Sequence, residues 1–132
     1  MRVIVFRNSE SQAGKRLRGI ITDAQPDIPV EYTDTLADLM ETLKRPGNGP
    51  SILVLQIVDQ RTLDELISAG DWLTDFQIIL ILPDQCPETI SKGHLLLPRF
   101  LTFANGGLEH VGTVLVRLSS QFRHKLGAID AA

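Results

Sequence analysis

Three short apolar runs limit the folds that this chain can adopt. They cover residues 3–6, 52–58 and 78–82, and they are rich in Ile, Val and Leu without a regular alternation of polar residues. Strands of a parallel sheet that is covered on both faces have this composition, whereas a strand with one face in water alternates. Residues 30–33 and 100–104 are two further candidate strands. The chain therefore predicts a five-stranded parallel sheet buried between helices.

The segments between these runs have the period of amphipathic helices. In the first segment, apolar residues recur on one helical face, at Ala13, Leu17, Ile20, Ile21 and Ala24. Ser9 and Gln12 predict a capping box at the start of this helix, in which the hydroxyl accepts a backbone N–H and the amide reaches back. Pro26 ends the helix, because proline lacks an N–H and disfavours the helical conformation of its predecessor.

Similar signals predict four more helices. Thr35 is the expected cap of the second helix, and Asp59 precedes a third that extends toward residues 72–73. Pro87 suits the first position of a short helix, which Gly93 limits to about two turns. A last, strongly amphipathic helix starts at about residue 108. Strands and helices thus alternate, which predicts an α/β fold: a doubly wound (βα)5 domain in three αβα layers, formed by residues 1–127, with 128–132 as a C-terminal tail.

Composition narrows the classes of function. The 132 residues carry a net charge of −3, from 13 basic and 16 acidic side chains, and they show no clustered basic face of the kind that binds nucleic acid. No apolar run approaches the roughly 20 residues of a membrane span. Cys86 is the one cysteine, so a reducing cytoplasm is the default location. We expect a cytoplasmic protein that binds neither nucleic acid nor membrane.

One polar residue stands out among the predicted strands. Gln56 lies in the stretch SILVLQIVDQ, at residues 51–60, where a buried strand has little use for an amide. In sheets of this kind, ligands and reactive groups gather beyond the carboxyl ends of the strands. The residues at these ends are therefore the candidate site residues.

The length, the order of elements and the strand phrases resemble the response-regulator receiver domain, the phospho-acceptor module of two-component signalling. The phrases are VIVFRNSES at the first strand, ILVLQIVD at the third, IILILPD at the fourth and FLTFAN at the fifth. The resemblance covers residues 1–127, nearly the whole chain. It implies a flavodoxin-like strand order of 2-1-3-4-5.

The resemblance also implies five functional positions. The pair of acids that helps to bind Mg²⁺ in the family falls on Arg7 and Asn8, and the aspartate that accepts the phosphoryl group falls on Gln56. The hydroxyl residue falls on Leu82, or on the proline after it, and the lysine falls on Phe103. None of the five positions keeps the residue type of the family, so we interpret them as a degenerate phospho-acceptor pocket.

Physical reasoning supports the same interpretation. Arg7 brings a fixed positive charge to the place of a cation that requires oxygen ligands, and the amide of Gln56 lacks the ionised oxygen of a phosphoryl acceptor. We therefore expect no catalytic residue, no metal and no cofactor. Gln56 is expected in a neutral polar cluster, hydrogen-bonded to Arg7 or Asn8, because a buried unpaired charge is costly. In a sharper alternative, Arg7 replaces the charge of the metal and fixes one signalling conformation.

Other polar residues are candidates for chemistry, but each has a simpler interpretation. Asp59 and Asp84 follow strands and could hold a displaced cation, although single acids at such places are more often helix caps. Cys86 could be a reactive thiol, but no neighbouring base is apparent, and an inert cysteine is the expectation. His94, His110 and His124 lack the spacing of metal ligands.

A second surface is expected from the resemblance. In receiver domains, the face that corresponds here to residues 88–97, 100–103 and the outer side of 108–125 mediates dimerisation or partner docking. Its candidate residues are Leu95, Leu96, Leu97, Phe100 and Arg117. The three leucines are expected to complete the core, and any that are exposed would form a contact patch.

We therefore expect a receiver-like domain of bacterial signalling that works without phosphorylation, through contact with a protein partner or as a homodimer. It is not expected to be an enzyme. The main alternative is a domain that binds a small molecule or nucleotide in the crevice at the carboxyl ends of the strands. A third hypothesis is an enzyme whose site includes Asp59, Asp84 and Cys86.

Overall fold

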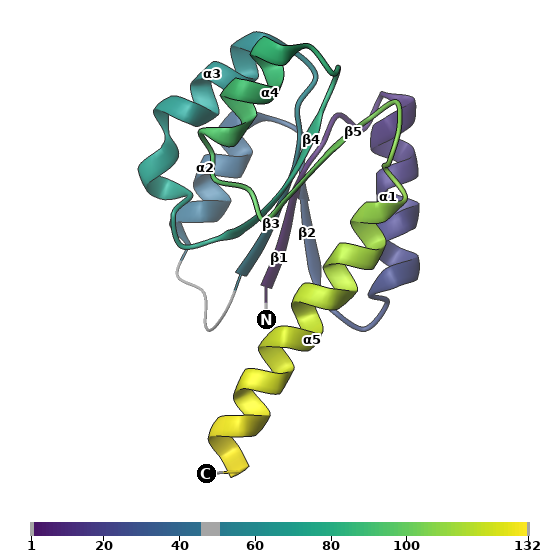
Figure 1. The fold of residues 1–132 in the computed structure, drawn as a ribbon, viewed down its shortest axis with the longest axis vertical. Helices are drawn as coiled ribbons and strands as arrows, with labels where there is room; N and C mark the ends of the chain where they lie inside the picture. The colour runs from purple at the N-terminus through teal and green to yellow at the C-terminus, as the bar shows by residue number, and fades with distance from the viewer. Residues whose placement is uncertain (1, 46–50, 132) are drawn as a thin grey trace.

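A computed structural model describes residues 2–45 and 51–131 of the chain. Its centre is a five-stranded sheet in the order β2-β1-β3-β4-β5, in which every pair of neighbouring strands is parallel. The strands are β1 (Arg2–Phe6), β2 (Val30–Thr33), β3 (Ser51–Gln56), β4 (Gln77–Leu82) and β5 (Phe100–Phe103). The expected fold class is confirmed: the molecule is a flavodoxin-like α/β sandwich of three layers (Figure 1).

The helices lie on both faces of this sheet. They are α1 (Gln12–Ala24), α2 (Leu36–Lys44), α3 (Gln60–Ser68), α4 (Pro87–His94) and α5 (His110–Ala131), with a short 3₁₀ turn, η1 (Gly70–Trp72), after α3. Helices α1 and α5 pack side by side on one face, and α2, α3 and α4 cover the other (Figure 1). Among the described residues, no helix is both long and apolar enough to cross a membrane.

The three central strands supply the core on both faces, because successive side chains of a strand point in opposite directions. Ile4 of β1 and Leu53 of β3 pack against α2, α3 and α4, whereas Val5 and Val54 pack against α1 and α5. All four side chains are fully buried. This double burial explains why the runs contain Ile, Val and Leu without alternation.

The caps of two helices are confirmed. The hydroxyl of Thr35 accepts a hydrogen bond from the backbone N–H of Asp38 at 3.1 Å, and the carboxylate of Asp59 accepts one from Thr62 at 2.7 Å. Pro87 is the first residue of α4, as predicted. Each of these signals is local, since it involves atoms only three or four residues apart.

The predicted capping box of α1 is wrong. The N-cap is Ser11, whose Oγ accepts a hydrogen bond from the backbone N–H of Gly14 at 2.9 Å. Ser9 instead donates its hydroxyl proton to the carboxylate of Asp34, beyond the end of β2. The connection from β1 to α1 is thus two residues longer than a cap at Ser9 would make it.

Two helix ends also differ from the prediction. Helix α3 ends at Ser68, and η1 covers the segment that we expected to be its last turn. Helix α5 continues to Ala131, so its backbone includes residues 128–131, which we expected to form a tail. Gly127 does not end α5, because one glycine in a helix costs only about 1 kcal/mol relative to alanine.

Candidate functional site

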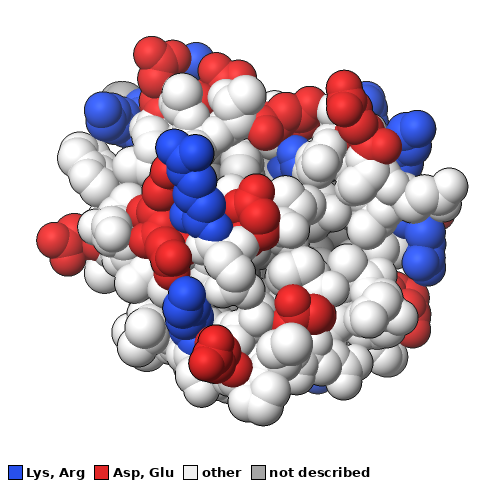
Figure 2. Space-filling model, turned by 90° about the horizontal axis from the view of Figure 1, so that it is seen from above, with Lys and Arg blue, Asp and Glu red and all other residues white. Residues whose placement is uncertain are grey.

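The strands of the sheet end at one edge, which we call the carboxyl edge, and Figure 2 views the molecule from this side. Arg7 and Asn8 directly follow β1, Gln56 ends β3, and Leu82 and Phe103 end β4 and β5. The fold thus brings the five residues of the degenerate pocket to one edge. Their side chains, however, enter three different environments.

Gln56 holds the ends of β1 and β3 together. Its Oε1 accepts a hydrogen bond from the backbone N–H of Asn8 at 2.9 Å, and its Nε2 donates to the Oγ of Ser11 at 3.2 Å. The residue is only 3% exposed. Both polar atoms of the amide therefore have partners, as the expectation of a neutral polar cluster requires. Asn8 contributes through its backbone, because its side-chain oxygen accepts from the N–H of Glu10.

Ser11 connects this cluster to helix α1. Besides capping the helix and accepting from Gln56, its Oγ donates a hydrogen bond to the carbonyl oxygen of Asn8 at 2.9 Å. All the hydrogen-bonding capacity of the hydroxyl is used. The loop lies so close to the helix that a Cβ on Gly14 would come within 1.8 Å of that same carbonyl oxygen. Glycine at this position allows the close approach.

Arg7 does not contact Gln56. Its side chain runs under the start of α1, where Nη1 donates to the carbonyl oxygen of Gly14 at 3.3 Å and the guanidinium lies 4.9 Å from the centroid of the Tyr32 ring. The residue is 8% exposed, and its Nε has no conventional hydrogen-bond partner. The face of the Tyr32 ring offers a weak acceptor for this charge. Arg7 is thus held by an aromatic ring and a carbonyl, and it forms no ion pair with any described residue.

Leu82 and Phe103 belong to the core. Leu82 is fully buried, and the partly buried Phe103 packs against the same cluster on the α2–α3–α4 face. Their backbones are register partners in β4 and β5. Neither side chain presents a polar atom at the carboxyl edge, so neither can hydrogen-bond or neutralise a phosphoryl group.

Acidic side chains surround this edge. Each of the five connections from a strand to the following helix carries an acid that is not buried: Glu10, Asp34, Asp59, Asp84 and Glu109. Figure 2 shows more acidic than basic surface on this side of the molecule. The negative potential that results disfavours the approach of phosphate-bearing ligands.

These acids do not build a cation site in the part of the chain that the structure describes, where no group of three or more His, Cys, Asp and Glu side chains could hold a metal ion. The magnesium ion that the resemblance associates with this edge does not fit the residues present. The oxygens of Gln56 and Asn8 are engaged with backbone N–H groups, and the buried guanidinium of Arg7 adds positive charge nearby.

Asp59, Asp84 and Cys86 have local roles. The hydrogen bond from the backbone N–H of Thr62 lowers the pKa of Asp59, and that from the N–H of Cys86 lowers the pKa of Asp84. The hydrogen bond with Asp84, followed by the charge of this carboxylate, raises the pKa of the Cys86 thiol. A raised pKa reduces the fraction of reactive thiolate, which argues against a nucleophilic cysteine here.

The second candidate surface is split between core and solvent. Leu96 is buried, as expected, but Leu95 is 65% and Leu97 is 81% exposed, so the expectation that all three complete the core is wrong. The reason is the turn after α4, in which Leu97 adopts a φ of 52° and points outward. Phe100 and Arg117 lie at a separate cavity between β5 and α5.

Sequence reasoning missed three residues that these sites use. Ser9 and Ser11 are both possible N-caps by local pattern, and the glycine three residues after Ser11 is the signal that favours Ser11, because it allows the loop to approach the helix closely. Tyr32 meets Arg7 across neighbouring strands, which no local pattern reveals. Arg99 lies beside the cavity at β5, and its position just before a predicted strand was the available signal.

Comparison with known proteins adds no relative to these observations. No family model matches the chain, and neither a curated protein nor a solved structure shows significant similarity to it. The class that the fold defines is therefore the flavodoxin-like α/β sandwich with the strand order 2-1-3-4-5.

Proposed function

We propose that this chain is a receiver-like signalling domain that works without phosphorylation, through contact with a protein partner. The fold has the strand order that the receiver resemblance implies, although many unrelated functions use such a fold. The proposal therefore depends on the sites. Its assignment to cytoplasmic, bacterial two-component signalling comes from the resemblance of the strand phrases alone.

The arrangement at the carboxyl edge supports a domain without phosphoryl transfer. At the position of the family's acceptor aspartate, both polar atoms of the Gln56 amide form hydrogen bonds, the oxygen with the N–H of Asn8 and the nitrogen with the hydroxyl of Ser11. An in-line transfer also requires groups that neutralise the developing charge on the phosphoryl oxygens, and the apolar side chains of Leu82 and Phe103 cannot do this. The same edge is poorly suited to the alternative, a crevice that binds a nucleotide. Its acidic side chains repel phosphate groups, and the polar atoms of Gln56 and Ser11 are already hydrogen-bonded to each other and to the backbone.

The observation that carries the proposed contact function is the conformation of Leu97. A leucine with positive φ is strained by about 1–2 kcal/mol, and helix ends normally place glycine or asparagine there. The strain at Leu97 holds a large apolar side chain in solvent, two residues from Leu95, which is also exposed. Strain that is retained at an exposed apolar position indicates a function in recognition.

A hollow beside these leucines gives the patch its shape. Leu95 and Leu97 flank a cavity of about 320 Å³, whose floor includes Phe76, Ile78 and Leu96. A partner side chain could enter it while the two exposed leucines pack on the partner's surface. An apolar anchor in a pocket, surrounded by further apolar contacts, is the usual form of an interface hot spot.

Incubation with a small phosphodonor and Mg²⁺, followed by intact mass measurement, tests the chemical half of the proposal. We expect no phosphoryl adduct on the natural chain or on the Gln56→Asp variant, because Arg7, Asn8 and Phe103 supply neither the acids that help to bind Mg²⁺ nor the lysine that contacts the phosphoryl group in the family. A stoichiometric adduct on the natural chain would refute the proposal.

Substitution of Leu97 tests the contact half. Leu97→Asn removes the apolar side chain and tolerates positive φ, so the variant should fold at least as well as the natural chain. We expect proteins captured from a cell lysate by the natural chain to be lost with Leu97→Asn and retained with Val58→Asn. Val58 is an exposed apolar residue at the other end of the molecule and serves as the control. Equal capture by the two variants would contradict the assignment of this surface.

A further inference from the structure

We propose that the cavity between β5 and α5 binds an amphipathic carboxylate, that is, a carboxylate head on a short apolar body. The site lies at the beginning of β5, at the end of the sheet opposite to the carboxyl edge. It differs from the leucine patch in its residues and in its chemistry. The inference goes beyond the proposed contact function and does not depend on it.

The cavity has a suitable size for such a ligand. Its volume is about 330 Å³, at the lower end of the roughly 300–1,000 Å³ that small-molecule sites occupy. A ligand with a short aliphatic or aromatic body fits a hollow of this size.

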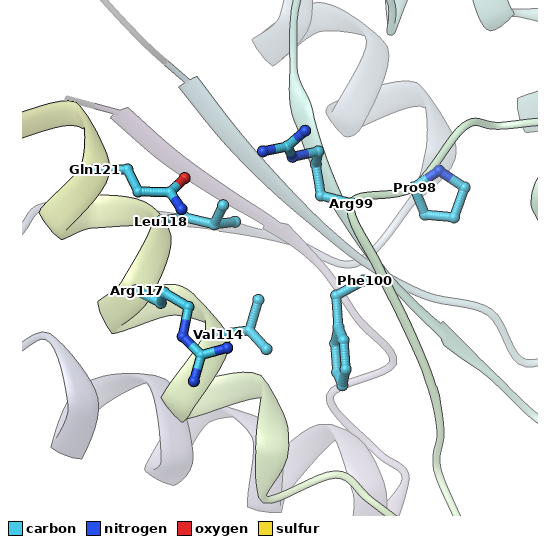
Figure 3. A pocket seen from close by; sticks show the side chains of 7 residues that line it. All are labelled: Pro98, Arg99, Phe100, Val114, Arg117, Leu118 and Gln121. Atoms are coloured by element: carbon cyan, nitrogen blue, oxygen red, sulfur yellow. The ribbon is translucent and has the colours of Figure 1, made fainter. Parts of the chain in front are cut away.

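Apolar side chains line the space between the strand and the helix. Phe100 projects from β5, and Val114 and Leu118 project from α5 toward the same gap (Figure 3). Leu118 is almost completely buried, while Phe100 and Val114 are partly exposed. The apolar body of a ligand would cover this exposed surface, and the removal of that surface from water favours binding.

Two arginines contribute positive charge to the same cavity. Arg99 lies next to the first residue of β5, and Arg117 lies on α5, so the guanidinium groups come from the two opposing walls (Figure 3). Neither forms an ion pair or a side-chain hydrogen bond with the described residues. Gln121 adds a neutral amide, and no acid is found among the described residues that line the cavity.

This combination selects the chemistry of the ligand. Guanidinium groups bind carboxylates through paired, charge-assisted hydrogen bonds, and each of these two arginines offers such a group at the rim of the cavity. No carboxylate stands among the described residues of the cavity wall, so the lining itself does not repel an anion. A cationic or neutral amphiphile would gain the apolar contacts alone.

Titration of the ¹⁵N-labelled full chain with sodium octanoate, followed by NMR and by calorimetry, tests the inference. We expect saturable shifts of the amide signals of β5 and of the first half of α5. Octanol and octylammonium should bind at least tenfold more weakly, because each lacks the head group that the arginines recognise. Octanol binding as tight as octanoate binding, or shifts confined to other elements, would overturn the inference.

Matched variants make the test specific. Arg99→Gln and Arg117→Gln should each weaken octanoate binding about tenfold, since a hydrogen bond to a charged group is worth roughly that factor. Arg16→Gln, which removes an exposed arginine from α1, should leave it unchanged. Val114→Phe fills the cavity without a change of charge and should abolish binding. Unaltered affinity in both arginine variants would refute the site, and loss of binding in Arg16→Gln would show that only net charge matters.

Discussion

The backbone N–H of Asn8 donates a hydrogen bond of 2.9 Å to the side-chain oxygen of Gln56, and this bond joins the ends of β1 and β3. The pairing answers why the apolar third strand ends with an amide. An amide accepts from Asn8 and donates to Ser11 at the same time, whereas an ionised carboxylate can only accept.

The first prediction concerns this difference between amide and acid. Gln56→Glu keeps the length of the side chain, but it loses the donor to Ser11 and places a carboxylate where the natural residue is 3% exposed. We expect a loss of about 3 kcal/mol of unfolding free energy at pH 8, measured by urea denaturation.

The pH dependence of this variant provides a second readout. Burial would raise the pKa of the glutamate in the folded state above its unfolded value of about 4.3. The folded variant then binds the proton of this carboxyl group more tightly than the unfolded variant does. The loss of unfolding free energy caused by Gln56→Glu should therefore be smallest below pH 4 and grow as the pH rises. Gln12→Glu, at an exposed position in the first turn of α1, is the control and should change stability by about 0.5 kcal/mol or less. A pH-independent loss would argue against a buried carboxylate.

A second prediction compares two glycines of helix α1. A Cβ at Gly14 would lie 1.8 Å from the carbonyl oxygen of Asn8, whereas a Cβ at Gly19 would meet no atom within 4 Å. Gly14→Ala should therefore destabilise the protein by about 3 kcal/mol, because the loop or the helix must move. Gly19→Ala should stabilise it by up to about 1 kcal/mol through helix propensity. Thermal unfolding of both variants measures the contrast, and equal effects would contradict the close approach.

A third prediction concerns the arginines that contact Tyr32. The buried guanidinium of Arg7 lies 4.9 Å and the exposed one of Arg18 lies 5.3 Å from the centroid of the ring. Double-mutant cycles with Tyr32→Leu should give a coupling free energy of about 2 kcal/mol for Arg7→Met and about 0.5 kcal/mol for Arg18→Met, because water screens the exposed pair. A larger coupling for Arg18 would show that the ring does not hold the buried charge.

A fourth prediction tests the cap of α3. Asp59→Ala removes the acceptor of the Thr62 N–H and should cost about 1 kcal/mol near pH 7, while Asp59→Asn should retain most of the stability. The hydrogen bond from Thr62 lowers the pKa of Asp59 in the folded state. The charge of Asp59 therefore contributes fully to the stability of the folded protein above the usual pKa of about 3.9. This contribution is lost as the pH falls toward the lower pKa of the folded state. Chemical denaturation from pH 7 to pH 2.5 should show the difference between the natural chain and Asp59→Asn narrow in acid.

The strands and their order could be expected from the sequence because their signals are strong. Runs such as residues 52–55 and 78–82 are buried on both faces, and few arrangements other than a covered parallel sheet use such runs. Strand ends agree with the prediction to within two residues. Caps that depend on one local bond, as at Thr35 and Asp59, were also predictable.

The details of the sites could not be predicted in this way, because they depend on contacts between distant parts of the chain. Gln56 and Ser11 are in contact although they lie 45 residues apart in the sequence. Arg7, just after β1, contacts Tyr32 of the neighbouring strand β2. The exposure of Leu97 follows from a backbone angle that leucine rarely adopts. A hydrophobic pattern alone would bury this residue.

The exposed cysteine at the start of α4 has a practical consequence for work on this protein. Cys86 is the one thiol of the chain and lies at the carboxyl edge, whereas Arg2 and the end of α5 lie at the other end of the sheet (Figure 1). A maleimide dye or a surface linker could be attached there without a tag near the arginines or leucines of the opposite end. The coupling should be run at mildly alkaline pH, because the neighbouring aspartate raises the pKa of the thiol. Immobilised in this orientation, the molecule would present the surfaces of both proposals to the solution.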